Sequence, residues 1–233
     1  MRIQVLLKRF AILACATVLA VPALADDAPA DRMARENVVR DAARPATPLP
    51  VELIRLADSV AKFGRTNRDP LSLIVAAGLL QKSGAKVVAR PPDGADAAAD
   101  VVAGDGGLSV EALLKEATTL SKNDATIVAL ANDVKASATK GRVDGGIITL
   151  GQIAGNTVQS RTLDFAGNRP AEVAAMGIDS NDIKLEIFDE GGHLICRDTD
   201  PAYCRFNPIW TGPFTLKVRN DGVSLAHYRL ETN

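Results

Sequence analysis

The spacing of hydrophobic and polar residues divides the chain into a helical part and a β-rich part. From about residue 48 to 141, apolar residues recur three and four positions apart, which is the period of an amphipathic α-helix. This pattern predicts four helices, with apolar stripes within Leu53–Ala61, Leu71–Leu80, Leu113–Leu120 and Ile127–Val134. The second is apolar nearly all round and is expected at the centre. We expect two helical hairpins packed as a small four-helix bundle, with a solenoid of helical repeats as the alternative.

Residues that commonly begin or end helices mark the boundaries of these segments. Asp69 followed by Pro70 is typical of a helix start, with Asp as the N-cap and Pro at the first helical position. The other expected boundaries are Gly64 as an end followed by a turn over residues 65–68, Gly84 as an end, Ser109 as a start, Asn123 or Asp124 as a start, and Gly141 as an end.

After about residue 156 the pattern changes to short runs that alternate between apolar and polar positions. Such alternation has the period of a half-buried β-strand. Turn signals at Glu190–Gly192 and Asn220–Gly222 separate some of the runs. The predicted strands are Thr157–Phe165, Ala171–Met176, Ile183–Phe188, His193–Cys196, Phe214–Val218 and Leu225–Leu230. We therefore predict an α+β protein, in which a small helical bundle precedes an antiparallel β-sandwich.

The segments between these elements lack periodic order. Residues 26–47 are polar and rich in Ala, Pro, Asp and Arg, which predicts a flexible leader before the helical domain at 48–141. Glycines, prolines and an Ala/Asp run predict a mobile loop at 85–107. Residues 142–156, with Gly145, Gly146 and Gly151, are expected to form a linker or hinge before the sandwich at 157–233, although 147–153 can form a short first strand.

The N-terminus has the layout of a secretory signal peptide. Arg2, Lys8 and Arg9 precede an apolar run of about 12 residues, and small residues before Asp26 form a cleavage site. The run is short for a membrane span, so residues 1–25 are expected to be removed. An uncleaved anchor, or a lipoprotein attached at Cys15, is the alternative. No later segment is apolar and long enough to span, which places the mature chain in the periplasm or outside the cell.

The charge composition of the chain argues against some classes of partner. Its 233 residues include 27 Lys and Arg against 28 Asp and Glu, and 47% are hydrophobic. Without residues 1–25 the balance becomes 24 basic to 28 acidic residues. The chain lacks the excess of positive charge that is typical of proteins binding nucleic acid or an anionic membrane, so neither is expected as the main partner.

Two cysteines remain in the mature chain, Cys196 and Cys204. In an oxidising compartment, two cysteines eight positions apart are most simply one disulfide. A metal site is the alternative, but it lacks the further Cys or His ligands that zinc takes. The disulfide leaves no cysteine free to act as a nucleophile.

Motifs of known chemistry are missing from the sequence. It contains no G-x-S-x-G, H-E-x-x-H, phosphate-binding loop or dinucleotide-binding motif. His193 and His227, its two histidines, are expected on strands of the sandwich. Ser224 and His227 are a poor nucleophile and base pair, because residues three apart on a strand point to opposite faces.

Five aspartates in turns of the sandwich are the candidate metal ligands: Asp179, Asp182, Asp189, Asp198 and Asp200. Calcium takes six to eight oxygen ligands, and carboxylates at one end of a sandwich can supply them. The simpler explanation is that Asp favours turns for its own hydrogen bonds. A pair of these acids acting as in glycoside hydrolases is a third interpretation.

Three aromatic residues lie close together in the sequence beside the cysteines: Tyr203, Phe206 and Trp210. If exposed on the sandwich, they would form a ligand patch, for example for a polysaccharide. The alternative is that they form part of the core.

The β-rich part resembles the pre-peptidase C-terminal-like module of secreted bacterial proteins. The matching segments are Gly167–Ala171, Asp179–Phe188, Asp189–Gly192, Cys196–Asp198, Trp210–Phe214 and Asn220–Asn233. Trp-Thr-Gly-Pro-Phe, then Lys-Val-Arg-Asn, then the terminal Tyr-Arg-Leu-x-Thr-Asn form the most specific part. The match covers about a third of the chain.

This resemblance implies a jelly-roll-like sandwich without a catalytic centre, of the kind often joined to secreted hydrolases. Some relatives bind calcium, or polymers such as collagen or glycans. The chain departs from the family pattern because no recognisable peptidase domain accompanies the module. The helical part resembles envelope proteins of unknown function through Phe63–Arg65 and Asp69–Leu71.

These observations predict a non-enzymatic periplasmic or secreted protein that acts through binding by its sandwich, to an envelope protein or a polysaccharide. Two alternatives stay open. A hydrolase with a carboxylate site would place Asp182 or Asp198 in a deep cleft with a second acid. An accessory protein would instead bind its partner in an apolar groove between Leu71–Leu80 and Ile127–Val134.

Overall fold

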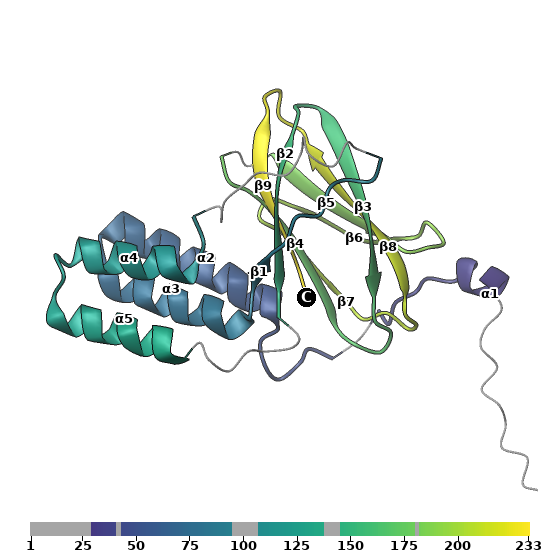
Figure 1. Cartoon of the computed structure of the whole chain (residues 1–233). Coiled ribbons are helices and arrows are strands. Elements are labelled where there is room, and N and C mark those ends of the chain that lie inside the picture. The colour runs from purple at the N-terminus through teal and green to yellow at the C-terminus, as the bar shows by residue number, and fades with distance from the viewer. Residues whose placement is uncertain (1–28, 41–42, 95–106, 138–144, 180–181) are drawn as a thin grey trace, which may run out of the picture.

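The computed structural model describes residues 29–40, 43–94, 107–137, 145–179 and 182–233. A bundle of helices packs against one β-sheet, and a second sheet packs on the opposite face of the first (Figure 1). The protein therefore has the predicted α+β fold with a C-terminal β-sandwich.

The sandwich strands pair as one long hairpin that is folded over into two sheets. Strand β2 pairs with β9, β3 with β8, β4 with β7 and β5 with β6, always antiparallel. The resulting orders are β1-β2-β9-β4-β7 in sheet A and β3-β8-β5-β6 in sheet B. This nested pairing is a jelly roll. The strands are β1 (Lys86–Val87), β2 (Ile147–Ile153), β3 (Thr157–Phe165), β4 (Ala171–Gly177), β5 (Ile183–Phe188), β6 (Leu194–Thr199), β7 (Ala202–Phe206), β8 (Gly212–Asn220) and β9 (Ala226–Thr232).

Strand β2 corrects the predicted linker at 142–156. Its residues pair with β9 from Ile147 opposite Thr232 to Ile153 opposite Ala226, so they belong to the sandwich. Helices cover one face of β2 and sheet B the other, which removes the apolar and polar alternation that reveals a strand. Strand β7 was not predicted. Two residues separate it from β6, which is longer than expected.

The four predicted helices are present, after a short α1 (Pro29–Met33). As predicted, side chains of Asp69, Ser109 and Asp124 accept hydrogen bonds from the first turns of their helices. The prediction that Gly64 ends the first helix is wrong. Gly64 is buried against the next helix, where a Cβ would lie 3.1 Å from the Asp69 carbonyl oxygen, and Arg68 supplies the left-handed end instead. The helices are α2 (Pro50–Asn67), α3 (Pro70–Ser83), α4 (Val110–Leu120) and α5 (Ala125–Ser137).

The helical bundle and sheet A share one interface. Ile148 and Leu150 of β2 lie in the same core as Ile54 of α2 and Leu73 of α3. Polar contacts reinforce it, because the Glu172 carboxylate on β4 accepts a hydrogen bond from the Val51 N–H at the start of α2, at 3.0 Å. The helices thus cover the outer face of sheet A.

Gly145 and Gly146 allow close packing at this interface, which corrects their interpretation as a hinge. A Cβ on Gly145 would lie 2.1 Å from the Gly84 carbonyl oxygen, and one on Gly146 would lie 2.7 Å from the Ile54 side chain. The Gly146 N–H also donates to the Ser83 carbonyl at 3.1 Å. These positions need glycine because the end of α3 touches the backbone there.

The N-terminal segment is anchored to the sandwich, so the flexible leader predicted over 26–47 is wrong for residues 37–40. Asn37 is fully buried, and its side-chain oxygen accepts hydrogen bonds from the N–H groups of Ile209 and Trp210, both at 3.0 Å. Val38 joins the sandwich core, and the Val39 N–H donates to the Asn207 carbonyl at 2.9 Å. The buried Asn37 side chain thus fixes the N-terminal segment to a loop of the sandwich. The composition of the segment could not predict this long-range contact.

The predicted mobile loop at 85–107 is ordered over its first part. Residues 86–88 bond to β2, and the Asp93 N–H donates to the Ser160 carbonyl at 2.8 Å. Residues 95–106, the predicted signal peptide at 1–25 and Gly141 lie outside the described residues. Among the helices that are described, none is both long and apolar enough to cross a membrane.

Candidate functional site

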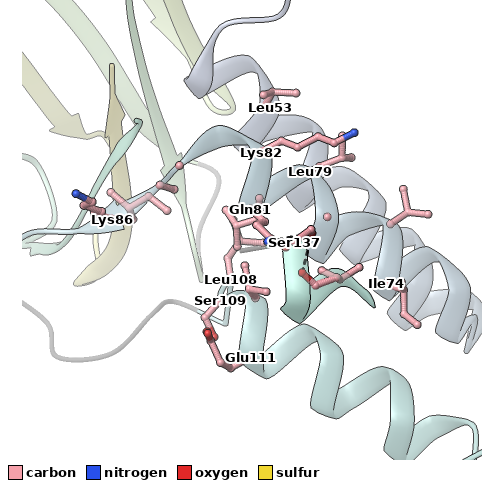
Figure 2. Close-up of a pocket in the computed structure, with 18 of the residues that line it drawn as sticks. Leu53, Ile74, Leu79, Gln81, Lys82, Lys86, Leu108, Ser109, Glu111 and Ser137 are labelled. Atoms are coloured by element: carbon pink, nitrogen blue, oxygen red, sulfur yellow. Dashed lines mark hydrogen bonds between the residues drawn. The ribbon is translucent and has the colours of Figure 1, made fainter. Parts of the chain in front are cut away.

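A groove of about 1350 Å³ lies where the helical bundle meets the edge of sheet A (Figure 2). We call it the helix–edge groove. Its walls come from α3, the start of α4, the end of α5, and β1 with the residues before it. Most of its lining is apolar: Leu53, Ile74, Val75, Leu79, Leu80, Val87, Leu108, Val110, Val134 and Ile148.

Helix α3 forms the longest wall because its sequence is apolar on nearly every side. Leu73 and Ala77 face the bundle core, whereas Val75 is 54% exposed although it is a large apolar residue. Gly78 lines the groove, and a Cβ added there would meet nothing within 4 Å. Glycine inside a helix costs roughly 0.5–1 kcal/mol relative to alanine. Packing within the bundle therefore does not require glycine at this position, and the space above Gly78 is open to a ligand.

Polar side chains occupy the rim of the groove. The Gln81 side-chain amide on α3 donates to the Ser137 hydroxyl on α5 at 3.2 Å, which joins the two helices at one end. Lys82, Lys86 and Glu111 are the charged residues of the lining. Apolar walls with a few polar groups at the margin are typical of binding sites for partly apolar ligands.

Strand β1 adds a free sheet edge to the groove. It is the first strand of sheet A, and of the strands that the structure describes it pairs only with β2. Lys86 N–H donates to the Gly146 carbonyl at 2.9 Å and Val88 N–H to the Ile148 carbonyl at 2.8 Å. Because successive N–H groups of a strand point to opposite sides, the Val87 N–H is directed away from β2, toward the open edge. Val87 is also 51% exposed.

The structure does not bring the five predicted aspartates together. Asp189 is buried and accepts hydrogen bonds from the N–H groups of Asn37 and His193, both at 2.9 Å. Asp198 accepts from the N–H of Tyr203, and Asp200 from that of Gly177.

The remaining two aspartates lie near the β8–β9 turn. Asp179 binds the ring of His227, with 2.5 Å between Oδ2 and Nδ1. Asp182 is exposed, and its backbone carbonyl accepts from the Asp221 N–H at 3.0 Å. Within the described ranges, no three His, Cys, Asp or Glu side chains are placed to hold a metal ion. The predicted calcium cluster is therefore not formed, because four of the five carboxylates bind separate protein groups instead of converging.

The predicted aromatic patch is also not formed. Phe206 is buried against Phe165 and Phe214, with ring centroids 5.3 and 4.9 Å apart. Tyr203 faces the helices, where its hydroxyl binds Glu172 and Arg55 lies over its ring. Trp210 contacts the N-terminal segment, and its indole N–H donates to Glu190. The three aromatics thus serve three different interfaces.

The predicted disulfide is confirmed. Cys196 on β6 is bonded to Cys204 on β7, and their Cα atoms are 6.0 Å apart. Since β6 belongs to sheet B and β7 to sheet A, the bond joins the two sheets covalently.

Buried carboxylates in this protein serve the interface between helices and sheet. Burial raises the pKa of Glu172, although hydrogen bonds from Tyr203 and the Val51 N–H oppose the shift. Glu231 on β9 binds Arg229, which also binds Asp58 of α2 at 3.2 Å. These groups connect elements, and none of them lines the helix–edge groove.

Comparison with known proteins gives partial structural matches. No protein-family model matches the chain, and no curated protein matches its sequence. PliG of Aeromonas hydrophila, a periplasmic inhibitor of g-type lysozyme, is 14% identical with a TM-score of 0.34, over 38% of this chain and 84% of PliG. The Yersinia pseudotuberculosis-derived mitogen is 15% identical with a TM-score of 0.32, over 39% of this chain and 86% of the mitogen. TM-scores this low assign neither a family nor a function to the chain.

The jelly roll implied by the pre-peptidase C-terminal-like resemblance is present, while membership of that family stays a prediction. The groove was anticipated in part, since Leu79 and Val134 lie in the two segments that the sequence placed on either side of it. The contribution of β1 was missed. A two-residue strand such as Lys86–Val87 is too short to show a period, so no sequence signal could have revealed it.

Proposed function

We propose that this protein is a non-catalytic binding protein of the periplasm or the cell exterior, and that its helix–edge groove holds an extended apolar segment of a partner protein. One observation carries the proposal: an apolar groove is bordered by a strand edge that no other described strand pairs with. The compartment rests on the signal-peptide pattern and on the disulfide, which is typical of oxidising environments.

The form of the groove favours a peptide over a small molecule. Small-molecule pockets usually measure roughly 300–1,000 Å³ and enclose most of their ligand. This groove is larger, at about 1350 Å³, and Val75 and Val87 in its walls are about half exposed. An extended segment can pair its backbone with a sheet edge and place alternate side chains in apolar pockets. The Val87 backbone and the space above Gly78 offer both features.

The surroundings of the groove support binding without catalysis. Lys82, Lys86 and Glu111 are its only charged lining residues among those described, and no histidine or cysteine accompanies them. Nucleophilic catalysis needs a nucleophile beside an activating base. The aspartates and histidines of the sandwich bind one another or backbone N–H groups elsewhere.

Contact through the sandwich is a second candidate function. Val223 and Leu225, just before β9, and Ile178, just after its neighbour β4, are large apolar residues with high exposure. Exposed apolar residues at one end of a domain are typical of contact surfaces. If this end is the contact, Val223→Asp will abolish partner binding while Gly78→Phe leaves it unchanged.

The test is a selection from a phage-displayed library of random 12-residue peptides on the immobilised, disulfide-bonded protein. Enriched peptides are then titrated by fluorescence anisotropy against wild type, Gly78→Phe and Gly78→Ala. Phe should fill the groove and weaken binding at least tenfold, whereas Ala should leave it unchanged and stabilise α3 by about 0.5–1 kcal/mol. Val87→Pro removes the edge N–H and should also weaken binding.

Two results would refute the proposal. One is the absence of any peptide enriched on wild type over Gly78→Phe, when thermal melts show both to be folded. The other is enriched peptides that bind wild type and Gly78→Phe with equal affinity.

A further inference from the structure

Arg161 is an arginine buried inside the β-sandwich. It lies on β3 with 1% of its surface exposed. By volume it is the largest fully buried residue among those described. Its Nε donates to the Arg90 carbonyl at 2.8 Å, and its guanidinium carbon lies 5.6 Å from the centre of the Tyr228 ring. Its two terminal nitrogens are buried and have no hydrogen-bond acceptor in the structure.

A second arginine lies beside it. Arg90 is partly buried and donates from Nη1 to the Thr232 hydroxyl on β9 at 3.0 Å. Burial lowers its pKa, and no acidic residue opposes that shift. Neither arginine forms an ion pair with an acid in the part of the chain that is described. Among the described residues, each arginine therefore carries a positive charge without an acidic partner, and the contact between the two runs through the Arg90 carbonyl.

Residues 88–93, which we call the strap, cover this edge. The strap is held to sheet A by the Val88 N–H on the Ile148 carbonyl and to sheet B by the Asp93 N–H on the Ser160 carbonyl, both at 2.8 Å. The Asp93 carboxylate binds the Thr162 hydroxyl at 2.9 Å. Because Thr162 points to the face of β3 opposite Arg161, the carboxylate of Asp93 does not neutralise this site.

An unneutralised buried charge is strongly unfavourable, whereas a paired one is tolerated. Buried arginines in proteins are almost always paired, and the flat guanidinium matches the oxygens of a carboxylate or a phosphate. We propose that Arg161 forms a binding site for a small oxyanion beneath the strap, between the two sheets of the sandwich. The ligand is a carboxylate or a phosphate-like group that accepts hydrogen bonds from the Arg161 terminal nitrogens.

The test is the thermal unfolding midpoint of the purified protein in sodium HEPES at constant ionic strength. Inorganic phosphate, sulfate and acetate are added separately at millimolar concentrations. Binding to the native state alone should raise the midpoint with the logarithm of the anion concentration, by roughly 5–10 °C at a hundredfold excess over the dissociation constant. The acetate arm distinguishes a carboxylate site from one for phosphate or sulfate. Isothermal titration calorimetry with the best anion should give one site per chain.

Three variants locate the effect. Arg161→Met should abolish the anion-dependent rise. Arg90→Met removes the hydrogen bond from the strap to Thr232 and should weaken the anion affinity at least threefold, which keeps the test valid if the first variant fails to fold. Arg219→Met, on the exposed face of β8, should respond as wild type does. The site is refuted if no anion shifts the wild-type midpoint, since the guanidinium is then hydrated only. It is equally refuted if folded Arg161→Met keeps the full rise.

Discussion

The two sheets of the sandwich have the same strand pairing but different surroundings. In sheet B, strands β5 and β8 alternate between buried and more exposed residues along their length, because one face meets solvent. In sheet A, six consecutive residues of β4 are buried, from Ala171 to Met176, because sheet B covers one face and helices cover the other. Sheet A is thus the centre of the molecule, and sheet B is an outer layer.

This difference explains where the groove lies. The helices cover sheet A over β4, β9 and β2, but the edge at β1 keeps one side without a neighbouring strand. The groove forms at that boundary, lined by helix residues and by Lys86 and Val87 of β1. In the described part of the chain no helix layer covers the outer face of sheet B, and most of the large apolar residues of this sheet lie in the sandwich core.

The largest difference between the sheets should come from buried charge. Arg229 of sheet A lies between Glu231 and Asp58, so Arg229→Met leaves the buried Glu231 carboxylate without its cation and leaves Asp58 with Lys62 alone. We expect a loss of about 3–5 kcal/mol in the free energy of unfolding, measured by urea titration. The matched change Arg219→Met on the exposed face of sheet B should alter stability by less than about 0.5 kcal/mol. Equal losses would contradict the proposed contrast.

Removing the covalent link between the sheets should have the next largest effect. Replacing Cys196 and Cys204 together by serine should lower the free energy of unfolding by about 2–3 kcal/mol, because the unfolded chain regains the freedom of a short loop. The double variant is compared with wild type in urea, with and without reductant. Reductant should destabilise wild type to the level of the variant and leave the variant unchanged.

Added volume should distinguish the outer faces of the two sheets. Ala174 of β4 is 1% exposed and lies opposite Glu231 and Tyr203, which contact α2 and its surroundings. Ala174→Leu should cost about 1–3 kcal/mol by overpacking. Thr215→Leu on the solvent side of β8 should stay within about 0.5 kcal/mol of wild type. A neutral Ala174→Leu would mean that the helices do not press on sheet A.

A smaller effect should appear in the pH dependence of stability. Burial raises the pKa of Glu172 in the folded protein above its ordinary value of 4.5. Between the unfolded and folded pKa values the native state holds an extra proton, so stability should fall as pH rises through this window and then stay level. Glu172→Gln should show a smaller fall than wild type, with the remainder coming from Glu231 and Asp200, whose pKa values burial also raises. Glu186→Gln on sheet B should retain the full fall. Urea titrations from pH 4 to 7 measure it, and identical pH profiles for wild type and Glu172→Gln would contradict it.

The same contrast decided what the sequence could predict. Strands β3 and β5 were predicted at their observed bounds, since alternation survives where one face is exposed. Strand β2, buried on both faces, was mainly assigned to a linker, and β7 was missed. Helices were easier, because Asp69 and Ser109 carry local capping signals.

The candidate site depended on contacts between distant segments. The sequence suggested an apolar groove beside α3, but the edge at Val87 exists only because β1 pairs with β2, about 60 residues further along. The partners of Asp189 and Trp210 come from the N-terminal segment, over 150 residues away in the chain. Such long-range contacts have no periodic signature.

The central claim is that the groove holds an extended segment against the edge of β1. Amide hydrogen exchange of the ¹⁵N-labelled protein, with and without a peptide from the library selection, tests it directly. We predict that the Val87 N–H exchanges at least tenfold more slowly in the complex, because it donates to the peptide backbone, while amides of sheet B are unchanged. A peptide that binds but leaves Val87 unprotected, or protects the β8–β9 turn instead, would contradict the claim.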